Sequence, residues 1–248
     1  MPINIQGNVG AGGLNNPDDV RTVKTRLIEL GYDWLAGAGA IDQVDQLTIK
    51  TIKLFQTIKA GLNTITGDGR VDENGDTLKW LQALNAPRWL MMPPGSIAEG
   101  FVNTELADHS DNHDFGVDWL ADTLRTSGAA YRVSFMNSHP TAPPLSINDT
   151  SLPQGGFTGA HATHQSGLAS DIRLPRKDGG VGGGITVGST SYDRNAMRAM
   201  LLAFRAQPLA KRVLLNDAVL RGEGLCVFAD GHDNHGHIEI KPPARVME

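Results

Sequence analysis

The chain has almost no cysteine, no excess of positive charge and no long apolar run, and each absence excludes a class of protein. Its one cysteine, Cys226, excludes an internal disulfide and a cysteine-rich zinc site, so a bound metal must have nitrogen and oxygen ligands. A formal net charge of -5 argues against the basic patch that nucleic-acid binding requires, so we expect no nucleic-acid partner. No segment approaches the roughly 18 apolar residues that span a membrane, so we expect no membrane partner either.

The N-terminal residues 1–13 also lack the basic start and apolar core of a secretory signal. The 248 residues, 40% hydrophobic and 20% charged, suffice for one large or two ordinary globular domains. We therefore expect a protein that is made in the cytoplasm without a cleavable signal. Any action outside the cytoplasm then needs another route.

Residues 1–85 contain three stretches with helical periodicity. The first begins at Asn16 and Pro17, a capping residue followed by a residue that suits the first helical position. The second covers residues 46–60, and the third begins near Asp76. Three short helices around one core predict a small N-terminal domain over residues 1–85.

Residues 86–100 contain three prolines and two glycines without periodicity, which predicts a linker between domains. Residues 101–248 mix helical and strand patterns, with strands expected at 131–135 and 225–228. The predicted fold class is α+β. It consists of a small three-helix domain over residues 1–85, followed by an α+β domain with a central antiparallel sheet.

Five of the eight histidines fall in two short clusters. The clusters comprise His161, His164 and Asp171 in the first and His232, His235 and His237 in the second. Strand alternation places His235, His237 and Glu239 on one face of a strand. A hydrolytic zinc site uses three protein ligands and leaves a fourth position open for water. His164, Asp171 and one histidine of the second cluster meet this count, and the remaining histidines can act as general base or stabilise charge.

The segment PLSINDTSLPQGGFTGAHATHQSGLASDIRL resembles the penicillin-insensitive murein endopeptidases. These belong to the group of metallopeptidases that includes lysostaphin-type enzymes and D-Ala-D-Ala carboxypeptidases. The family's histidine followed by SHQxGLDxDI is matched by His161 and THQSGLASDI, and its GHD followed by HxH is matched by residues 231–237. In one departure, this chain has Ala169 where the family usually has an acidic residue.

The resemblance implies roles for the clustered residues. His164, Asp171 and His237 would bind zinc, His235 would be the general base, and His232 would assist it. His161 would support the ligands from outside the metal's coordination sphere. The implied reaction is zinc-dependent hydrolysis of amide bonds in the stem peptides or cross-links of peptidoglycan.

Residues 8–84 resemble the peptidoglycan-binding domain of bacterial wall hydrolases, on the motifs DVRTVKTRLIELGY, TIKTIKLFQ, a DG turn and TLKWL. The loop AGAGAIDQVDQ departs from the family's usual glycine-rich turn. This second resemblance implies peptidoglycan as the partner of the chain.

Two alternatives stay open at this point. The first is another wall enzyme on the same scaffold, either an N-acetylmuramoyl-L-alanine amidase or a D,D-carboxypeptidase. The second is a non-catalytic wall-binding protein with a structural metal, whose coordination four protein ligands would fill.

A wall hydrolase without a signal fits a phage lysin or an injected effector, and the opening INIQGNVGAGG resembles the start of some such effectors. An effector would have an immunity protein or a secretion machinery as a further partner.

Overall fold

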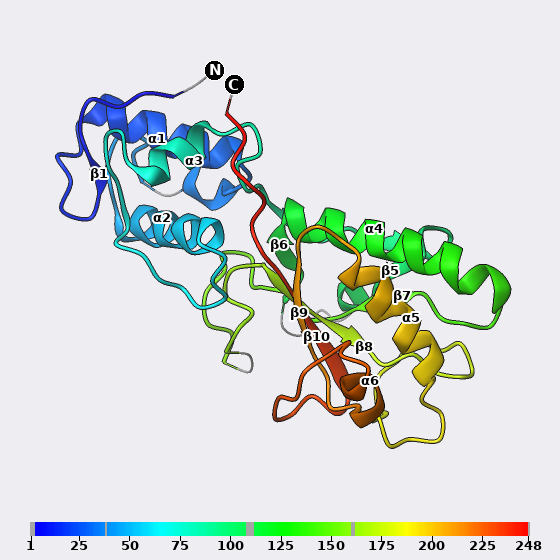
Figure 1. Cartoon of the computed structure of the whole chain (residues 1–248). Coiled ribbons are helices and arrows are strands. Elements are labelled where there is room, and N and C mark those ends of the chain that lie inside the picture. Colours follow the sequence, from blue (N-terminus) through cyan, green and yellow to red (C-terminus); the bar gives the residue numbers. More distant parts are fainter. Residues whose placement is uncertain (1–2, 38, 108–111, 160–161, 248) are drawn as a thin grey trace.

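The computed structural model describes residues 3–37, 39–107, 112–159 and 162–247. Helices and strands occur along the whole of this part of the chain, so the fold class is α+β (Figure 1). No helix within the described ranges is both long and apolar enough to cross a membrane.

Helices occur at all three places where the N-terminal sequence predicts them. They are α1 (Pro17–Glu29), α2 (Gln46–Lys59) and α3 (Asp76–Gln82). A short antiparallel pair, β1 (Val9–Gly10) and β2 (Arg70–Val71), lies beside them. Gly31 follows α1 with a φ of 91°, and a Cβ atom there would overlap the carbonyl oxygen of Trp89. Glycine is therefore required at this turn.

A six-stranded sheet forms the centre of the remaining chain. Its strands in spatial order are β4 (Gly95–Ser96), β5 (Phe101–Asn103), β7 (Leu145–Ile147), β8 (Ala169–Arg173), β10 (His235–Ile240) and β9 (Ala210–Leu214). The pair β5–β7 is parallel and the other pairs are antiparallel. The sheet is thus mixed rather than antiparallel as predicted, because β5 and β7 are joined by a long helical crossover.

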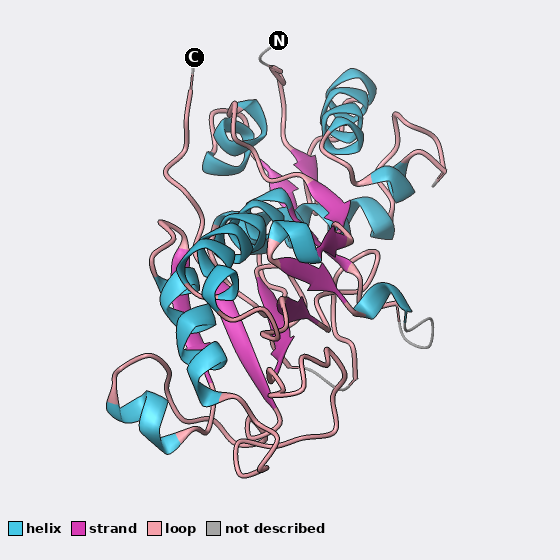
Figure 2. Cartoon of the chain, turned by 90° about the vertical axis from the view of Figure 1, so that its right-hand side faces the viewer, coloured by secondary structure: helices cyan, strands magenta, loops and turns pink. Residues whose placement is uncertain are grey.

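Two long helices, α4 (Asp118–Ser134) and α5 (Arg194–Arg205), pack on each other and lie along the sheet (Figures 1 and 2). Asp193 caps α5 by accepting hydrogen bonds from two backbone N–H groups. The side chains of Met197 on α5 and Ile172 on β8 both lie against Gly236 of β10. The helices therefore cover the face of β8 that carries Ile172, which leaves Asp171 on the opposite face.

Two predicted strands are absent. Residues 131–135 belong to the end of α4 and its cap, where Tyr131 is buried and Val133 is 74% exposed. Residues 225–228 form no strand, and Val227 makes only an isolated bridge to β9. Alternation over four or five residues does not distinguish a strand from the apolar stripe of a helix or from a loop that contacts the core.

The segment predicted as a linker, residues 86–100, has regular structure. It contains β3 (Trp89–Met91), which pairs antiparallel with β6 (Phe115–Val117). Trp89 is buried, and its Nε1 donates a hydrogen bond to the carbonyl of Pro153 at 2.8 Å. The end of the chain also returns to the N-terminal region, where the N–H of Leu84 bonds to the carbonyl of Val246 at 2.9 Å.

Short helices complete the described chain. They are α6 (Ala218–Gly222) and the 3-10 helices η1 (Asp33–Leu35), η2 (Ile97–Glu99), η3 (Glu105–Ala107) and η4 (Met136–Ser138). Of these, η1 and η3 contribute residues to the sites described below.

Candidate metal centre

His164, Asp171 and His237 meet in the interior of the protein, and each is nearly inaccessible to solvent. The Nε2 atom of His164 lies 3.1 Å from Nδ1 of His237. The Oδ1 atom of Asp171 lies 2.9 Å from that Nδ1 and 3.2 Å from Nε2 of His164. Two imidazoles and one carboxylate thus direct three ligand atoms at one point.

The local fold explains why these atoms converge. The antiparallel strands β8 and β10 pair so that Asp171 lies directly opposite His237, which puts both side chains on one face. His164 precedes β8 in a tight turn at Gly167, whose φ is 66°. A Cβ atom at Gly167 would overlap the backbone of Gly116 and the ring of Trp89. The glycine between His164 and Asp171 is therefore needed for the turn.

The spacing and donor chemistry fit a metal ion. Ligands that bind a tetrahedral zinc ion at about 2.0–2.1 Å lie roughly 3.3 Å from one another. The three separations of 2.9, 3.1 and 3.2 Å are close to that value. The Nδ1 atom of His164 lies 2.8 Å from the carbonyl oxygen of Thr150, which can only accept, so His164 carries its proton there. Its Nε2 is left with a lone pair directed at the other ligands.

The electrostatics of the centre favour a cation. Burial alone would raise the pKa of Asp171, but its contacts with the imidazoles of His164 and His237 hold that pKa far below its usual range. Burial alone would lower the pKa of His237, but the carboxylates of Asp171 and Glu239 raise it to about 9. His237 therefore holds a proton beside Asp171 at neutral pH, in a position where a metal cation would relieve the same negative charge.

Glu239 is a functional candidate to which the sequence assigned no role. Its carboxylate is completely buried, and Oε1 lies 3.5 Å from Nε2 of His237 and 2.6 Å from Nη2 of Arg212. Lys211 Nζ lies 3.2 Å from its other oxygen. Burial alone would raise the pKa of Glu239, but His237, Arg212 and Lys211 lower it to about 2. A charged carboxylate behind a ligand histidine fixes the ring and increases its basicity toward a metal.

Glu239 also bears on the departure at Ala169. The two residues are partners across β8 and β10. The buried carboxylate of Glu239 thus lies on β10, directly opposite the position on β8 where this chain has alanine in place of an acidic residue. The signal that could have found Glu239 is its position two residues after His237, on the same face of the strand.

His235 lies at the edge of the centre. Its side chain is 26% exposed, and Nε2 lies 3.5 Å from Oδ2 of Asp171. Its Nδ1 lies 2.7 Å from Oδ1 of Asn234, which can orient the ring. His235 therefore reaches Asp171 from the side that solvent can enter, and it is not one of the three converging ligands.

The other two predicted histidines differ in what the structure describes. The ring of His232 lies 4.8 Å from that of His235 and 5.7 Å from that of His237, centroid to centroid. His232 therefore belongs to the same cluster. His161 lies outside the described residues.

A second group can hold a metal by the same geometric criterion. Its members are Glu105 on η3, His113 and Asp149, with ligand atoms within 4.8 Å of one another. The N–H of Thr150 bonds to the carbonyl of His113 at 2.8 Å, and the carbonyl of Thr150 contacts His164. The second group is thus connected to the first through one residue. No spacing in the sequence indicates it, because its members come from separate segments.

Comparison with known proteins adds no family to this description, since no family model and no curated protein matches the chain. We therefore infer the function from the side chains themselves. These are a buried pair of imidazoles with one carboxylate that can hold a metal ion, and a partly exposed histidine beside them.

Proposed function

We propose that the protein is a zinc-dependent peptidoglycan hydrolase, a murein endopeptidase that cleaves amide bonds in stem peptides or their cross-links. The observation that carries the proposal is the pairing of a buried three-ligand group with the partly exposed His235 at its edge. Three protein ligands leave one position for water, which is the arrangement of hydrolytic rather than structural zinc sites.

The donor set supports zinc as the metal. His164 and His237 offer nitrogen ligands and Asp171 offers an oxygen ligand. The single cysteine of the chain is buried elsewhere, so no thiolate contributes to this group. When bound, zinc supplies a water of pKa near 7 and a Lewis acid for the substrate carbonyl. Glu239 and the carbonyl of Thr150 hold the two ligand imidazoles in orientation.

His235 acts as the general base in this proposal. Its Nε2 accepts the proton of the attacking water and then donates it to the leaving amine. Asn234 orients the ring from the Nδ1 side, where its Oδ1 lies at 2.7 Å. His232, whose ring lies 4.8 Å from that of His235, is placed to stabilise negative charge on the carbonyl oxygen during the reaction.

The proposal extends to the N-terminal residues and to the setting. Residues 1–85 serve as a three-helix peptidoglycan-binding domain that keeps the enzyme at the wall. The protein acts on the wall as a phage lysin or as an injected effector, with an immunity protein or a secretion machinery as its partner in the second case. Neither nucleic acid nor membrane is a partner in this account.

Digestion of purified sacculi tests the proposal. We expect the zinc-loaded protein to convert cross-linked muropeptides into uncross-linked ones, as identified by mass spectrometry. An amidase would instead free the glycan from the stem peptide, and a carboxypeptidase would remove only a terminal residue. His237→Ala serves as the control without metal. Unchanged muropeptides after incubation with fully metallated protein would reject the proposal.

A further inference from the structure

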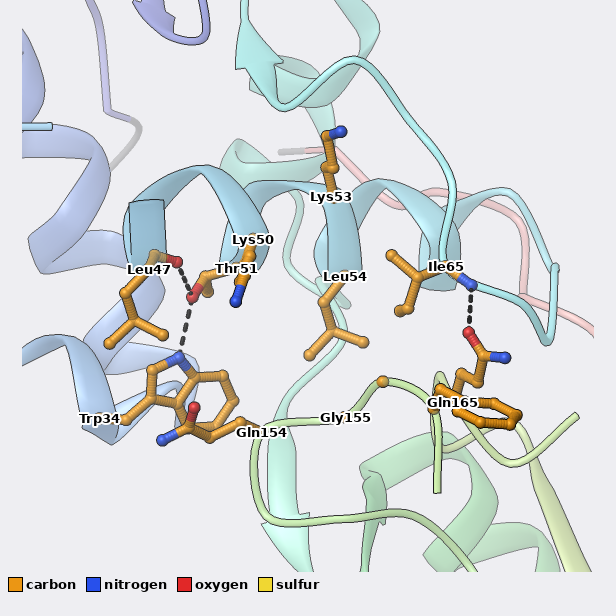
Figure 3. Close-up of a pocket in the computed structure, with 12 residues that line it drawn as sticks. Trp34, Leu47, Lys50, Thr51, Lys53, Leu54, Ile65, Gln154, Gly155 and Gln165 are labelled. Atoms are coloured by element: carbon orange, nitrogen blue, oxygen red, sulfur yellow. Dashed lines mark hydrogen bonds between the residues drawn. The ribbon is translucent and has the colours of Figure 1, made fainter. Parts of the chain in front are cut away.

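A cavity of about 420 Å³ lies between α2 and the loop at residues 154–157 (Figure 3). Its volume falls in the range of small-molecule and peptide-side-chain sites. Most of the lining is apolar, with Trp34, Leu47, Leu54 and Ile65 from the N-terminal region. None of the residues that line this cavity belongs to the metal centre, and the reaction proposed above does not use the cavity.

The aromatic wall of the cavity is held in place. Nε1 of Trp34 donates to Oγ1 of Thr51 at 2.8 Å, and this hydroxyl donates to the carbonyl of Leu47 at 2.8 Å (Figure 3). The ring of Trp34 also packs edge-to-face with Tyr32 and Trp89, at centroid distances of 5.5 and 6.2 Å. With its polar atom already bonded, the indole offers only an apolar surface to a ligand.

The opposite wall comes from the second half of the chain. Gly155 has a φ of 64°, and a Cβ atom there would overlap the side chain of Leu54 and the carbonyl oxygen of Gln165. The N–H of Gly156 bonds to that carbonyl at 2.8 Å. The side chain of Gln165 accepts from the N–H of Ile65 at 2.9 Å. The loop is thereby fixed close to α2, and the cavity is a built feature of the fold.

Gln165 also connects the cavity to the metal centre. It follows His164 directly, so their Cα atoms are about 3.8 Å apart. His164 contributes to the centre, and Gln165 lines the cavity. The cavity and the metal centre therefore draw on two consecutive residues of the same segment.

The charged side chains around the cavity indicate which class of ligand it can bind. Lys50 is exposed on α2, and its side chain extends between Trp34 and Leu54, whereas Lys53 points to the other side of the helix (Figure 3). None of the described residues that line the cavity is acidic. A ligand with small apolar groups and a carboxylate therefore matches the lining better than a neutral or basic one.

We propose that this cavity binds the part of an acidic stem peptide that extends from the bond being cut. Methyl groups of alanine-type residues contact Trp34 and Leu54, and a carboxylate of the peptide pairs with Lys50. This assignment rests on the proposed function, because it takes the stem peptide as the substrate. The exposed ring of Phe157, which also lines the cavity, covers the bound peptide.

Binding measurements that do not require cleavage test the assignment. The full chain carrying His235→Ala is titrated by calorimetry with a soluble stem peptide, with the same peptide amidated at its carboxylates, and with the peptide-free disaccharide. We expect the acidic peptide to bind most tightly. Adding Lys50→Glu should weaken its binding by about five- to tenfold and leave the weaker binding of the amidated peptide unchanged.

Matched variants separate a binding role from a folding effect. Lys79→Glu changes an exposed lysine on α3 outside the cavity and should leave peptide affinity unchanged. Phe157→Ala removes a ring that is 67% exposed, so the fold is retained while affinity falls several-fold. Tighter binding of the disaccharide, no binding of the peptide, or equal affinity in Lys50→Glu would each overturn the assignment. Peptide binding without any hydrolysis by the unmodified protein would instead overturn the proposed function alone.

Discussion

His164 Nε2 and His237 Nδ1 lie 3.1 Å apart although 73 residues separate them in the chain. The turn at Gly167 brings the first histidine to the start of β8, and the pairing of β8 with β10 brings the second to the same point. Asp171, opposite His237, completes the group. The centre therefore depends on the register of two strands, and a disturbance of either strand should disturb the metal.

Removal of a ligand should remove one metal ion. We expect His164→Ala and His237→Ala to lose one equivalent of tightly bound zinc, because two remaining ligands hold it poorly. Metal analysis after dialysis measures the loss. His139→Ala is the control, since His139 is exposed and stacks on Phe135 at 4.0 Å. Full retention of zinc by both ligand variants would contradict the assignment.

Neutralising Glu239 should weaken the metal without removing a ligand. We expect Glu239→Gln to lower zinc affinity by roughly 10- to 100-fold, because the charge that faces Nε2 of His237 is lost. Competition with a chelator measures the change. Glu223→Gln removes an exposed carboxylate paired with Arg198 and should have no effect. Equal affinities in the two variants would show that Glu239 has only a structural role.

The turn before β8 offers a backbone test. Gly167→Ala places a Cβ atom against Gly116 and the ring of Trp89 at a φ of 66°, so we expect a loss of about 2–3 kcal/mol in unfolding free energy. The displaced His164 should also reduce zinc binding. Gly182→Ala is the control, because nothing lies within 4 Å of a Cβ atom there. Urea unfolding and metal analysis of both variants check the prediction, and identical behaviour would refute it.

Asp217 provides a prediction for acid stability. Its buried carboxylate caps α6 and accepts from Nε of Arg194 at 2.7 Å. Burial alone would raise the pKa of Asp217, but Arg194 and the backbone N–H of Leu220 lower it. A carboxylate whose pKa is lowered in the folded state stabilises the protein fully when the pH is above its pKa in the unfolded state, about 3.9. This stabilisation is lost as the pH falls through its pKa in the folded state.

Asp217→Asn keeps a capping side chain and removes the charge. We expect it to cost about 1–2 kcal/mol of unfolding free energy at pH 7 and progressively less as the pH falls below the unfolded pKa of about 3.9. Urea unfolding of both proteins across this pH range measures the difference. A difference that stays constant with pH would show that the charge of Asp217 does not contribute.

Local signals in the sequence were sufficient for the elements whose ends are chemically marked. Pro17 after Asn16 marks the start of α1, and the alternation from His235 to Ile240 marks β10. Gly167 marks the turn that the metal centre needs. These features depend on neighbouring residues, so the sequence displays them directly.

Features that depend on distant partners could not be predicted in this way. The prediction of a strand at residues 131–135 was wrong, because these residues end α4, which buries Tyr131 on the same face as Leu124. The parallel pairing of β5 with β7, the facing of Ala169 by Glu239 and the cavity beside Gln165 all arise from contacts across the fold. No short window of sequence contains both partners.

The most direct test of the account compares zinc content with turnover in His235→Ala. In the proposed mechanism His164, Asp171 and His237 hold the metal, and His235 transfers the proton. The variant should therefore keep its zinc while hydrolysis of a cross-linked muropeptide falls by roughly 10²- to 10⁴-fold. Loss of zinc as complete as in His237→Ala would indicate a closed structural site with His235 as the fourth ligand, and undiminished turnover would remove His235 from the reaction. Either result would contradict the account.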